Sequence, residues 1–199
     1  MSKILIAYYS RTGENYVSGR IKTLKTGNTA IAAGIIQQLT AGDLFRIEQA
    51  TPYSQIYNEC IEQARADQNR DARPALKNCP DTLGEYDVIY LGYPIYWNTM
   101  PMAVFTFLEQ YDFTGKVIRP FCTHVGSGFG SSIQDIRKLC PKAAVTPGLA
   151  LRGGSVEHSR QEIESWLQEE KKLASRKWVY SPLGRKMTHL RNILWGRAI

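Results

Sequence analysis

The chain has 199 residues, 43% of them hydrophobic, and a formal net charge of +7, which favours one domain with a buried core. No apolar run approaches the ~18–20 residues of a membrane-spanning helix, and no signal peptide precedes the first expected strand. The four cysteines have neither metal-ligand nor CxxC spacing, so we expect reduced thiols in a cytoplasmic protein.

The positive charge is concentrated at the C-terminus. Residues 171–199 hold eight of the 25 basic residues and none of the 18 acidic ones, so residues 1–170 carry a net charge near −1. We therefore predict a nearly neutral domain, residues 1–170, followed by a basic tail, residues 171–199.

Strands and helices are predicted to alternate along the first 172 residues. In chain order we expect strand 4–9, helix 30–39, edge strand 43–48, helix 55–69, central strand 86–94, helix 102–111, strand 116–123, helix 133–139, strand 149–151, and a helix that begins after Ser155 or Ser159 and ends near residue 172. This alternation predicts an α/β fold, with a parallel sheet covered by helices on both faces.

A small polar loop follows the first strand. Ser10, Arg11 and Thr12 come directly after it, and residues 27–30 lead into the first helix. Free N–H groups and the positive end of the helix dipole favour an anion at such a place, and hydroxyl groups add donors. The loop alone is also compatible with an ordinary polar turn and a helix cap.

The loop after the central strand is the most specific signal. Tyr96 and Trp97 lie between Pro94 and Pro101, which stiffen the segment. An exposed tryptophan on a rigid loop favours a flat aromatic ligand as its partner. The alternative is that Trp97 packs under the following helix.

These loops resemble those of the flavodoxin family. Residues 10–13 and 27–29 are similar to the two halves of a flavodoxin phosphate loop, Ser/Thr-x-Thr-Gly-x-Thr, with residues 14–26 inserted between them. Residues 94–101 resemble the Pro-x-x-Trp loop of short flavodoxin-like proteins, and the glycine-rich residues 124–132 resemble the loop around the pyrimidine edge of the flavin. Over roughly residues 3–168, the resemblance implies a three-layer flavodoxin-like sandwich with a five-stranded parallel sheet of order 2-1-3-4-5 and a ligand at the switch between strands 1 and 3.

The resemblance implies FMN as the cofactor, since there is one phosphate loop and no second anion site to favour FAD. The expected phosphate contacts are Ser10, Asn28, Thr29 and Ala30, together with Thr12, and Arg11 is expected among the residues that bind the cofactor. The expected ring contacts are Pro94, Ile95, Tyr96, Trp97 and Asn98, and the expected polar-edge contacts are His124, Gly126, Ser127, Gly128 and Phe129.

Two of these assignments have open alternatives. His124 either lies near the N1–C2=O edge of the ring or forms a hydrogen bond within its own loop. The insertion either forms a flap, from which Asn15 and Tyr16 reach the ribityl chain or the phosphate, or folds away.

Three functions fit this fold. The leading hypothesis is an electron-transfer flavoprotein without catalytic residues of its own, working with redox partner proteins or small-molecule donors and acceptors. The second is an FMN-dependent NAD(P)H or quinone reductase, and a third, disfavoured because no acids follow strands 1 and 3, is a receiver-type binding module. No metal site is expected.

The tail has its own pattern. Leu183, Met187, Leu190, Leu194 and Ala198 recur at helical spacing among basic residues. Such a helix binds an anionic membrane surface, mediates self-association or packs on its own domain. Nucleic-acid binding is not expected, because no recognition motif accompanies the charge.

Overall fold

The computed structural model describes residues 2–179, with the side chains of residues 2–169. The chain divides into a unit from Met1 to Arg160 and a second from Gln161 to Ile199. Helix α5 (Arg160–Val179) supplies the described part of the second unit, so the last helix runs beyond the predicted end near residue 172. The boundary predicted between residues 170 and 171 falls inside α5, and the apolar positions of the tail, 183–198, lie outside the described residues.

The first unit is built on a parallel sheet. Its strands are β1 (Ile4–Tyr8), β4 (Asp43–Arg46), β5 (Val88–Pro94), β6 (Val117–His124), β7 (Ala144–Val145) and β8 (Leu149–Arg152). The order is β4-β1-β5-β6, with both β7 and β8 pairing to the free side of β6. If β7 and β8 are taken as one position, this is the predicted order 2-1-3-4-5, but the sheet has six strands in the described part of the chain rather than five.

Pro120 explains why the last position of the sheet is split. The Ile118 carbonyl of β6 accepts a hydrogen bond (3.0 Å) from the N–H of Thr146, the residue that follows β7. Every second residue of a strand directs its backbone N–H and C=O groups to the same neighbouring strand. Pro120, two residues further, therefore has no N–H to give on that side. The ladder stops after β7 and resumes at the Phe121–Leu149 pair of β8.

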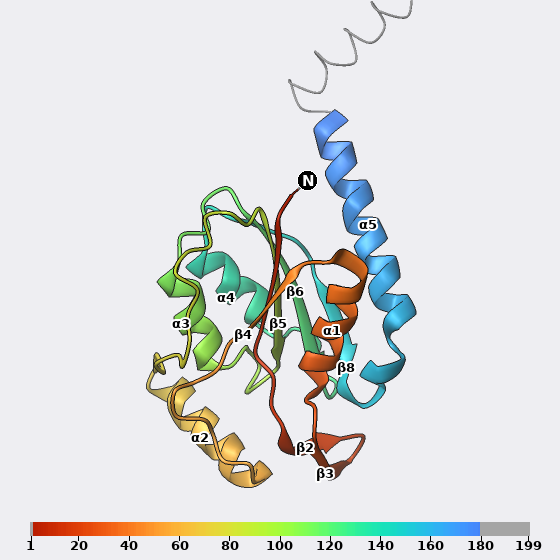
Figure 1. Cartoon of the computed structure of the whole chain (residues 1–199). Coiled ribbons are helices and arrows are strands. Elements are labelled where there is room, and N and C mark those ends of the chain that lie inside the picture. The colour runs from red at the N-terminus through yellow and green to blue at the C-terminus, as the bar shows by residue number, and fades with distance from the viewer. Residues whose placement is uncertain (1, 180–199) are drawn as a thin grey trace, which may run out of the picture. The chain divides into compact units, whose positions relative to one another are not determined.

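Helices cover both faces of the sheet (Figure 1), with α1 on one face and α3 and α4 on the other. Their bounds are α1 (Asn28–Thr40), α2 (Tyr57–Asn69), α3 (Met102–Gln110) and α4 (Ser132–Leu139), and a short 3-10 helix η1 (Gly153–His158) precedes α5. Six successive residues of β5 and six of β6 are buried, as expected for central strands covered on both faces. A Cβ at Gly92 would run into the Phe121 ring, so glycine is needed there for β5 and β6 to pack.

The predicted insertion forms a β-hairpin. Strands β2 (Gly13–Val17) and β3 (Arg20–Leu24) pair antiparallel, apart from the main sheet. The two residues between them, Ser18 and Gly19, have φ of 51° and 85°, which is the left-handed conformation of a two-residue type I′ turn. The insertion is therefore a folded element of its own rather than an irregular loop.

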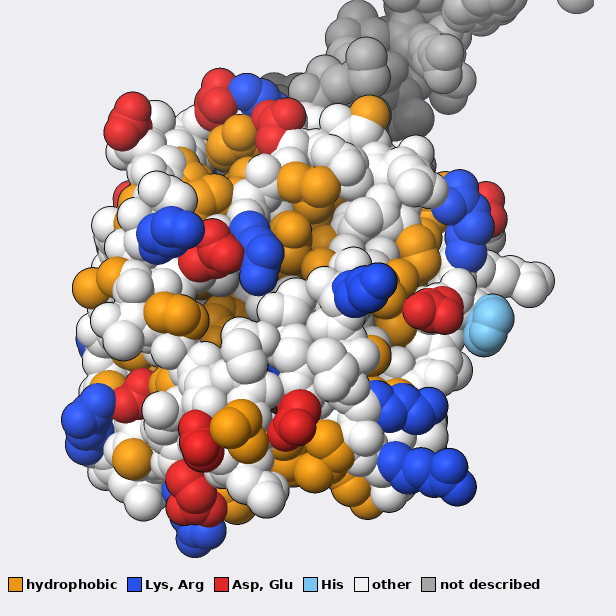
Figure 2. Space-filling model, turned by 60° about the horizontal axis from the view of Figure 1, so that its bottom comes forward, with side chains coloured by type: hydrophobic (Ala, Val, Ile, Leu, Met, Phe, Trp, Pro, Cys, Tyr) orange, Lys and Arg blue, Asp and Glu red, His pale blue; other side chains and the backbone are white. Residues whose placement is uncertain are grey.

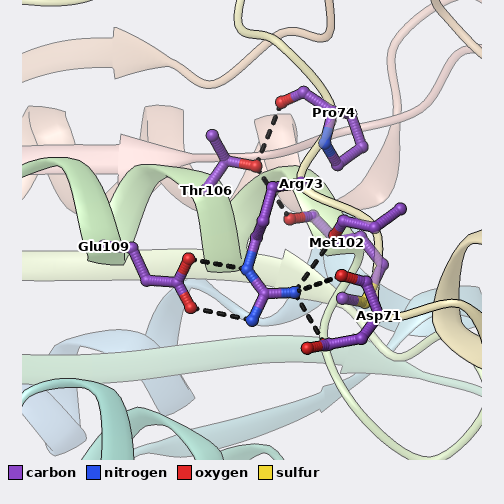
Figure 3. A network of polar contacts seen from close by, with 7 residues as sticks. Asp71, Arg73, Pro74, Met102, Thr106 and Glu109 are labelled. Carbon is purple, nitrogen blue, oxygen red and sulfur yellow. Dashed lines mark hydrogen bonds and ion pairs between the residues drawn. The ribbon is translucent and has the colours of Figure 1, made fainter.

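The long loop after α2 is fastened to α3 by a polar network (Figure 3). The Arg73 guanidinium donates two hydrogen bonds to the Glu109 carboxylate (2.6 and 2.8 Å) and another to Asp71 Oδ1 (2.7 Å). The Thr106 hydroxyl donates to the Pro74 carbonyl (3.0 Å). A loop without regular structure is held in this way against the outer helix layer.

All four cysteines, Cys60, Cys79, Cys122 and Cys140, are free, as expected. None of the helices in residues 2–179 combines the length and the apolar composition needed to cross a lipid bilayer.

Candidate functional site

A cavity of about 250 Å³ opens at the carboxyl edge of the sheet, between the loops that follow β1, β5 and β6. This edge cavity lies on the side at the bottom of Figure 1, where β1 ends and α1 begins, and Figure 2 shows hydrophobic side chains exposed there among charged ones. Its lining comprises Ser10, Arg11, Asn15, Tyr16, Asn28, Thr29, Tyr57, Ile61, Ala64, Pro94, Ile95, Tyr96, Trp97, Thr123, His124, Val125 and Gly153. No Asp or Glu is among these described residues.

The N-terminus of α1 forms one end of the edge cavity. Gly27 is the N-cap, and a Cβ there would run into the Arg11 carbonyl and the Ser10 hydroxyl. The Ala30 N–H donates to the Ser10 hydroxyl oxygen (3.1 Å), which joins the two halves of the loop. The N–H groups of the first helical turn and the positive helix end therefore face a cavity without acids, as an anion requires.

Thr29 has a structural role as well. Its hydroxyl is buried and shares a 2.8 Å hydrogen bond with the hydroxyl of Thr123, at the end of β6. This contact fixes the start of α1 against the sheet. The Thr29 side chain therefore faces β6, and its backbone is the part available to an anion.

The hairpin borders the same end of the cavity. Asn15 and Tyr16 of β2 both line it, and the Tyr16 ring stacks on Tyr57 of α2 (centroids 6.1 Å apart, 29° between planes). The Glu14 N–H donates to the Gln55 carbonyl (2.9 Å), and the Tyr57 N–H donates to the Glu14 carboxylate (2.9 Å). The hairpin is thus attached to the start of α2.

The other end of the cavity is formed by the loop after β5. Trp97 and Asn98 have φ of 46° and 71°, an unfavourable region for residues with a Cβ. Helix α2 stabilises this conformation, because Trp97 Nε1 donates to the Ile61 carbonyl (2.8 Å) and Gln68 Nε2 donates to the Trp97 carbonyl (3.0 Å). The Arg65 guanidinium lies 4.6 Å from the centre of the Trp97 ring.

Trp97 is thus held by α2, not by the following helix α3 as the alternative interpretation had it. Trp97 remains 39% exposed and lines the cavity. Beside it, the Tyr96 hydroxyl is buried next to the Cys60 thiol, and burial raises the pKa of both groups. Both are therefore neutral, and neither is a ready nucleophile.

The loop after β6 closes the remaining side. His124 Nδ1 accepts a hydrogen bond from the Gly128 N–H (3.1 Å). Burial, together with the nearby Arg152 charge, lowers the pKa of His124, so the neutral ring is favoured. His124 therefore lines the cavity and also forms a hydrogen bond within its own loop, as the second interpretation predicted.

Eleven of the eighteen residues predicted to bind a cofactor line the edge cavity: Ser10, Arg11, Asn15, Tyr16, Asn28, Thr29, Pro94, Ile95, Tyr96, Trp97 and His124. Thr12 instead lines a side cavity of about 190 Å³, on the other side of Ser10 and Arg11. The remaining residues outside the lining are Ala30, Asn98, Gly126, Ser127, Gly128 and Phe129. Phe129 packs against the core, and the Asn98 carbonyl accepts the Ser131 N–H (2.7 Å), so both support the loops around the cavity.

Six lining residues were not predicted: Tyr57, Ile61, Ala64, Thr123, Val125 and Gly153. Thr123 and Val125 flank His124, and their position at a strand end was a usable signal. The three residues of α2 are spaced for one helix face, but the sequence does not show that this face meets the loop after β5.

The comparisons with known proteins agree with this fold. The flavodoxin family profile matches residues 3–170. The chain belongs to the flavodoxin family. The sequence-based resemblance and the predicted α/β flavodoxin-like fold are both confirmed. No curated protein matches this flavodoxin significantly.

Solved structures resemble this flavodoxin over most of its length. A protein from Bacteroides eggerthii DSM 20697, provisionally described as a flavoprotein, is 32% identical with a TM-score of 0.68, and the match covers 84% of this chain and 97% of that one. A similarly described protein from Bacteroides uniformis ATCC 8492 is 27% identical with a TM-score of 0.66, covering 84% of this chain and 98% of that one. A flavoprotein from Lactobacillus acidophilus NCFM in complex with FMN is 19% identical with a TM-score of 0.56, covering 79% and 98%, and this likeness concerns the fold alone.

Proposed function

We propose that this flavodoxin binds FMN in the edge cavity and serves as an electron carrier. The observation that carries the proposal is the pairing, in one cavity, of an acid-free helix N-terminus with an exposed tryptophan face. Bound FMN supplies the redox chemistry, because it accepts and donates electrons. The protein supplies binding, orientation and electrostatics.

The residues present fit FMN. The Ser10 hydroxyl and the N–H groups of Asn28 and Thr29 would hold the phosphate, beside a glycine cap whose missing Cβ leaves the loop halves in close contact. Trp97 would stack on the ring, and the loop that begins at His124 would border its polar edge. The FMN-bound flavoprotein from Lactobacillus acidophilus has the same fold, which supports this assignment.

The protein groups beside the cavity favour a carrier over an enzyme with its own acid–base residues. Cys60 and Tyr96 are kept neutral by burial, His124 is neutral and bonded to Gly128, and the described lining holds no carboxylate. Cys60 and Tyr96 therefore hold their protons, and no carboxylate of the described lining is available as a general base.

One observation favours a reductase as a second candidate. Tyr16 lines the cavity, is 42% exposed and stacks on Tyr57, so its ring offers a stacking surface for a nicotinamide or a quinone.

Two measurements test these functions. Titration of FMN with the purified protein is expected to quench flavin fluorescence and to give the visible spectrum of a bound oxidised flavin; a colourless protein that leaves the fluorescence unchanged would contradict FMN binding. Anaerobic mixing of the loaded protein with NADH or NADPH then separates the candidates. Slow or absent bleaching supports the carrier, and rapid bleaching supports the reductase.

A further inference from the structure

Arg11 holds an unusual position between the two cavities. It follows Ser10 in the loop after β1 and lines both the edge cavity and the side cavity. Its guanidinium donates to three backbone carbonyls: those of Glu14 (3.1 Å from Nε and 2.9 Å from Nη2), Ser54 (2.5 Å) and Gln55 (2.9 Å). The side chain therefore joins the phosphate loop to the hairpin and to the segment before α2.

All of these hydrogen-bond partners are uncharged. Among the described residues, no carboxylate forms an ion pair with Arg11, whereas Arg73 is paired with both Glu109 and Asp71. Arg11 bonds to the backbone carbonyl of Glu14, whereas the Glu14 carboxylate accepts the Tyr57 N–H at the start of α2. Carbonyl dipoles solvate the guanidinium without cancelling its charge, so Arg11 leaves a net positive charge beside the cavity.

The charge of Arg11 acts on two tyrosines that line the edge cavity, Tyr57 and Tyr96. Burial raises the pKa of Tyr57 and of Tyr96, and in both cases the positive charge of Arg11 opposes that rise. At the other side, the Arg11 carbonyl lies against Gly27, the cap of α1, where the helix dipole is also positive. Arg11 and the first residues of α1, Asn28 and Thr29, line the same cavity, so both positive contributions act on what the cavity holds.

We propose that Arg11 is a specificity-determining residue, whose uncompensated charge makes the cavity select a flavin that carries a phosphate over one that lacks it. This inference rests on the proposed binding of FMN in the edge cavity. By bonding to three carbonyls, Arg11 also positions the hairpin, and with it Asn15 and Tyr16, at the cavity. The charge acts on the phosphate alone, whereas the positioning acts on any flavin.

This distinction defines the experiment. The affinities of the full chain for FMN and for riboflavin, which lacks the phosphate, are measured by fluorescence titration for the wild type, Arg11→Met, Arg11→Lys and Arg20→Met. The control residue Arg20 is an exposed cation at the start of β3 in the same hairpin, away from the described lining of the cavity. The ratio of the two affinities is taken within each variant, so a partly unfolded sample changes both values equally and leaves the ratio intact.

For Arg11→Met we expect the dissociation constant of FMN to rise roughly 10- to 100-fold and that of riboflavin to rise less than about threefold. Arg11→Lys keeps the positive charge, so its ratio of FMN affinity to riboflavin affinity should stay within about threefold of the wild type. It loses the several N–H donors of the guanidinium that hold the hairpin, so proteolysis between Gly13 and Gly27 should be faster. Arg20→Met should leave the ratio unchanged. The dependence of FMN affinity on salt should weaken in Arg11→Met alone.

An equal loss for FMN and riboflavin in Arg11→Met would reduce Arg11 to a positioning residue and overturn the proposal. A ratio in Arg11→Lys as low as in Arg11→Met would also overturn it, because the charge would then not be the selecting feature. A wild type that binds neither flavin contradicts the proposed function itself, which is a separate result.

Discussion

The end of the edge cavity at the start of α1, the proposed phosphate end, is built mainly from backbone, whereas the end at Trp97, the proposed ring end, depends on side chains that reach from α2. At the first end, Gly27 caps α1, and the Ala30 N–H of that helix donates a hydrogen bond to the Ser10 hydroxyl oxygen. At the second, Trp97 is held in a left-handed conformation by Ile61, Arg65 and Gln68 of α2.

This difference teaches how each end should respond to mutation. A site made of N–H groups tolerates many changes of side chain but not an added Cβ at its closest approach. A site made by an aromatic side chain loses its contact when that side chain is truncated, and it also loses the strained backbone that presents it. Substitutions at each end should therefore have separable effects on FMN binding.

The largest effect should come from Gly27→Val. Because the new side chain would run into the Arg11 carbonyl and the Ser10 hydroxyl, the two halves of the phosphate loop must separate. We expect FMN affinity to fall more than about 100-fold, measured by fluorescence titration. A smaller change than that of Trp97→Ala would show that the backbone is not the main element of this end.

The matched control for Gly27→Val is Gly34→Ala, in the interior of the same helix. A Cβ at Gly34 meets no atom within 4 Å. Since alanine is the better helix former, the free energy of unfolding should rise by roughly 0.5–1 kcal/mol, with FMN affinity unchanged. Loss of FMN binding in this variant would mean that α1 as a whole, rather than its cap, is sensitive to added atoms.

At the ring end, Trp97→Ala should weaken FMN and riboflavin by the same factor, roughly 10- to 30-fold, because both flavins carry the same ring. Trp97→Phe keeps an aromatic face but removes the Nε1 donor to Ile61, so its loss should be smaller. Equal titration curves for wild type and Trp97→Ala would place the ring elsewhere.

The two ends of the edge cavity also differ in how well the sequence predicts them. The loop of hydroxyls and glycine before α1 could be found from local signals, since such residues before a helix determine their own geometry. The alternation of strands and helices predicted the parallel sheet, and the family resemblance implied its order. Residues 14–26 were expected as an insertion, but the hairpin turn at Ser18 and Gly19 was not recognised. The role of α2 at Trp97 and the bonds of Arg11 to Ser54 and Gln55 join residues more than 30 positions apart, and no local pattern encodes them.

A smaller effect is expected from the pH dependence of stability at His124, in the loop after β6. His124 has a lowered pKa, so its neutral form is the one that the folded state favours and that accepts the Gly128 N–H. Its contribution to stability is complete above the ordinary value of 6.5 and is lost as the pH falls from there through the lowered pKa of the folded state.

Thermal unfolding should therefore show a larger fall in stability between about pH 8 and about pH 5.5 for the wild type than for His124→Asn, which does not titrate there. FMN affinity should follow the same difference, since the loop from His124 to Gly128 borders the cavity. Parallel pH profiles for the two proteins would show that His124 does not titrate in this range.

The smallest effect on the cofactor is expected from removing the tail. In the described part of the chain, the residues that line the edge cavity lie between Ser10 and Gly153, so truncation after Lys172 should change FMN affinity by less than about twofold. The tail should matter elsewhere, because it carries eight basic residues and no acid, and Leu183, Met187, Leu190 and Leu194 would each contribute about 1.5–3 kcal/mol if buried against a partner. We propose that it mediates self-association or binding to an anionic surface.

Sedimentation of the full chain and of the chain truncated after Lys172, with anionic and with neutral vesicles, tests this proposal. The full chain should self-associate or bind the anionic vesicles, and the truncated chain should do neither. Loss of flavin on truncation would contradict the predicted boundary at residue 170, and identical sedimentation of the two proteins under all conditions would mean that the tail packs on its own domain.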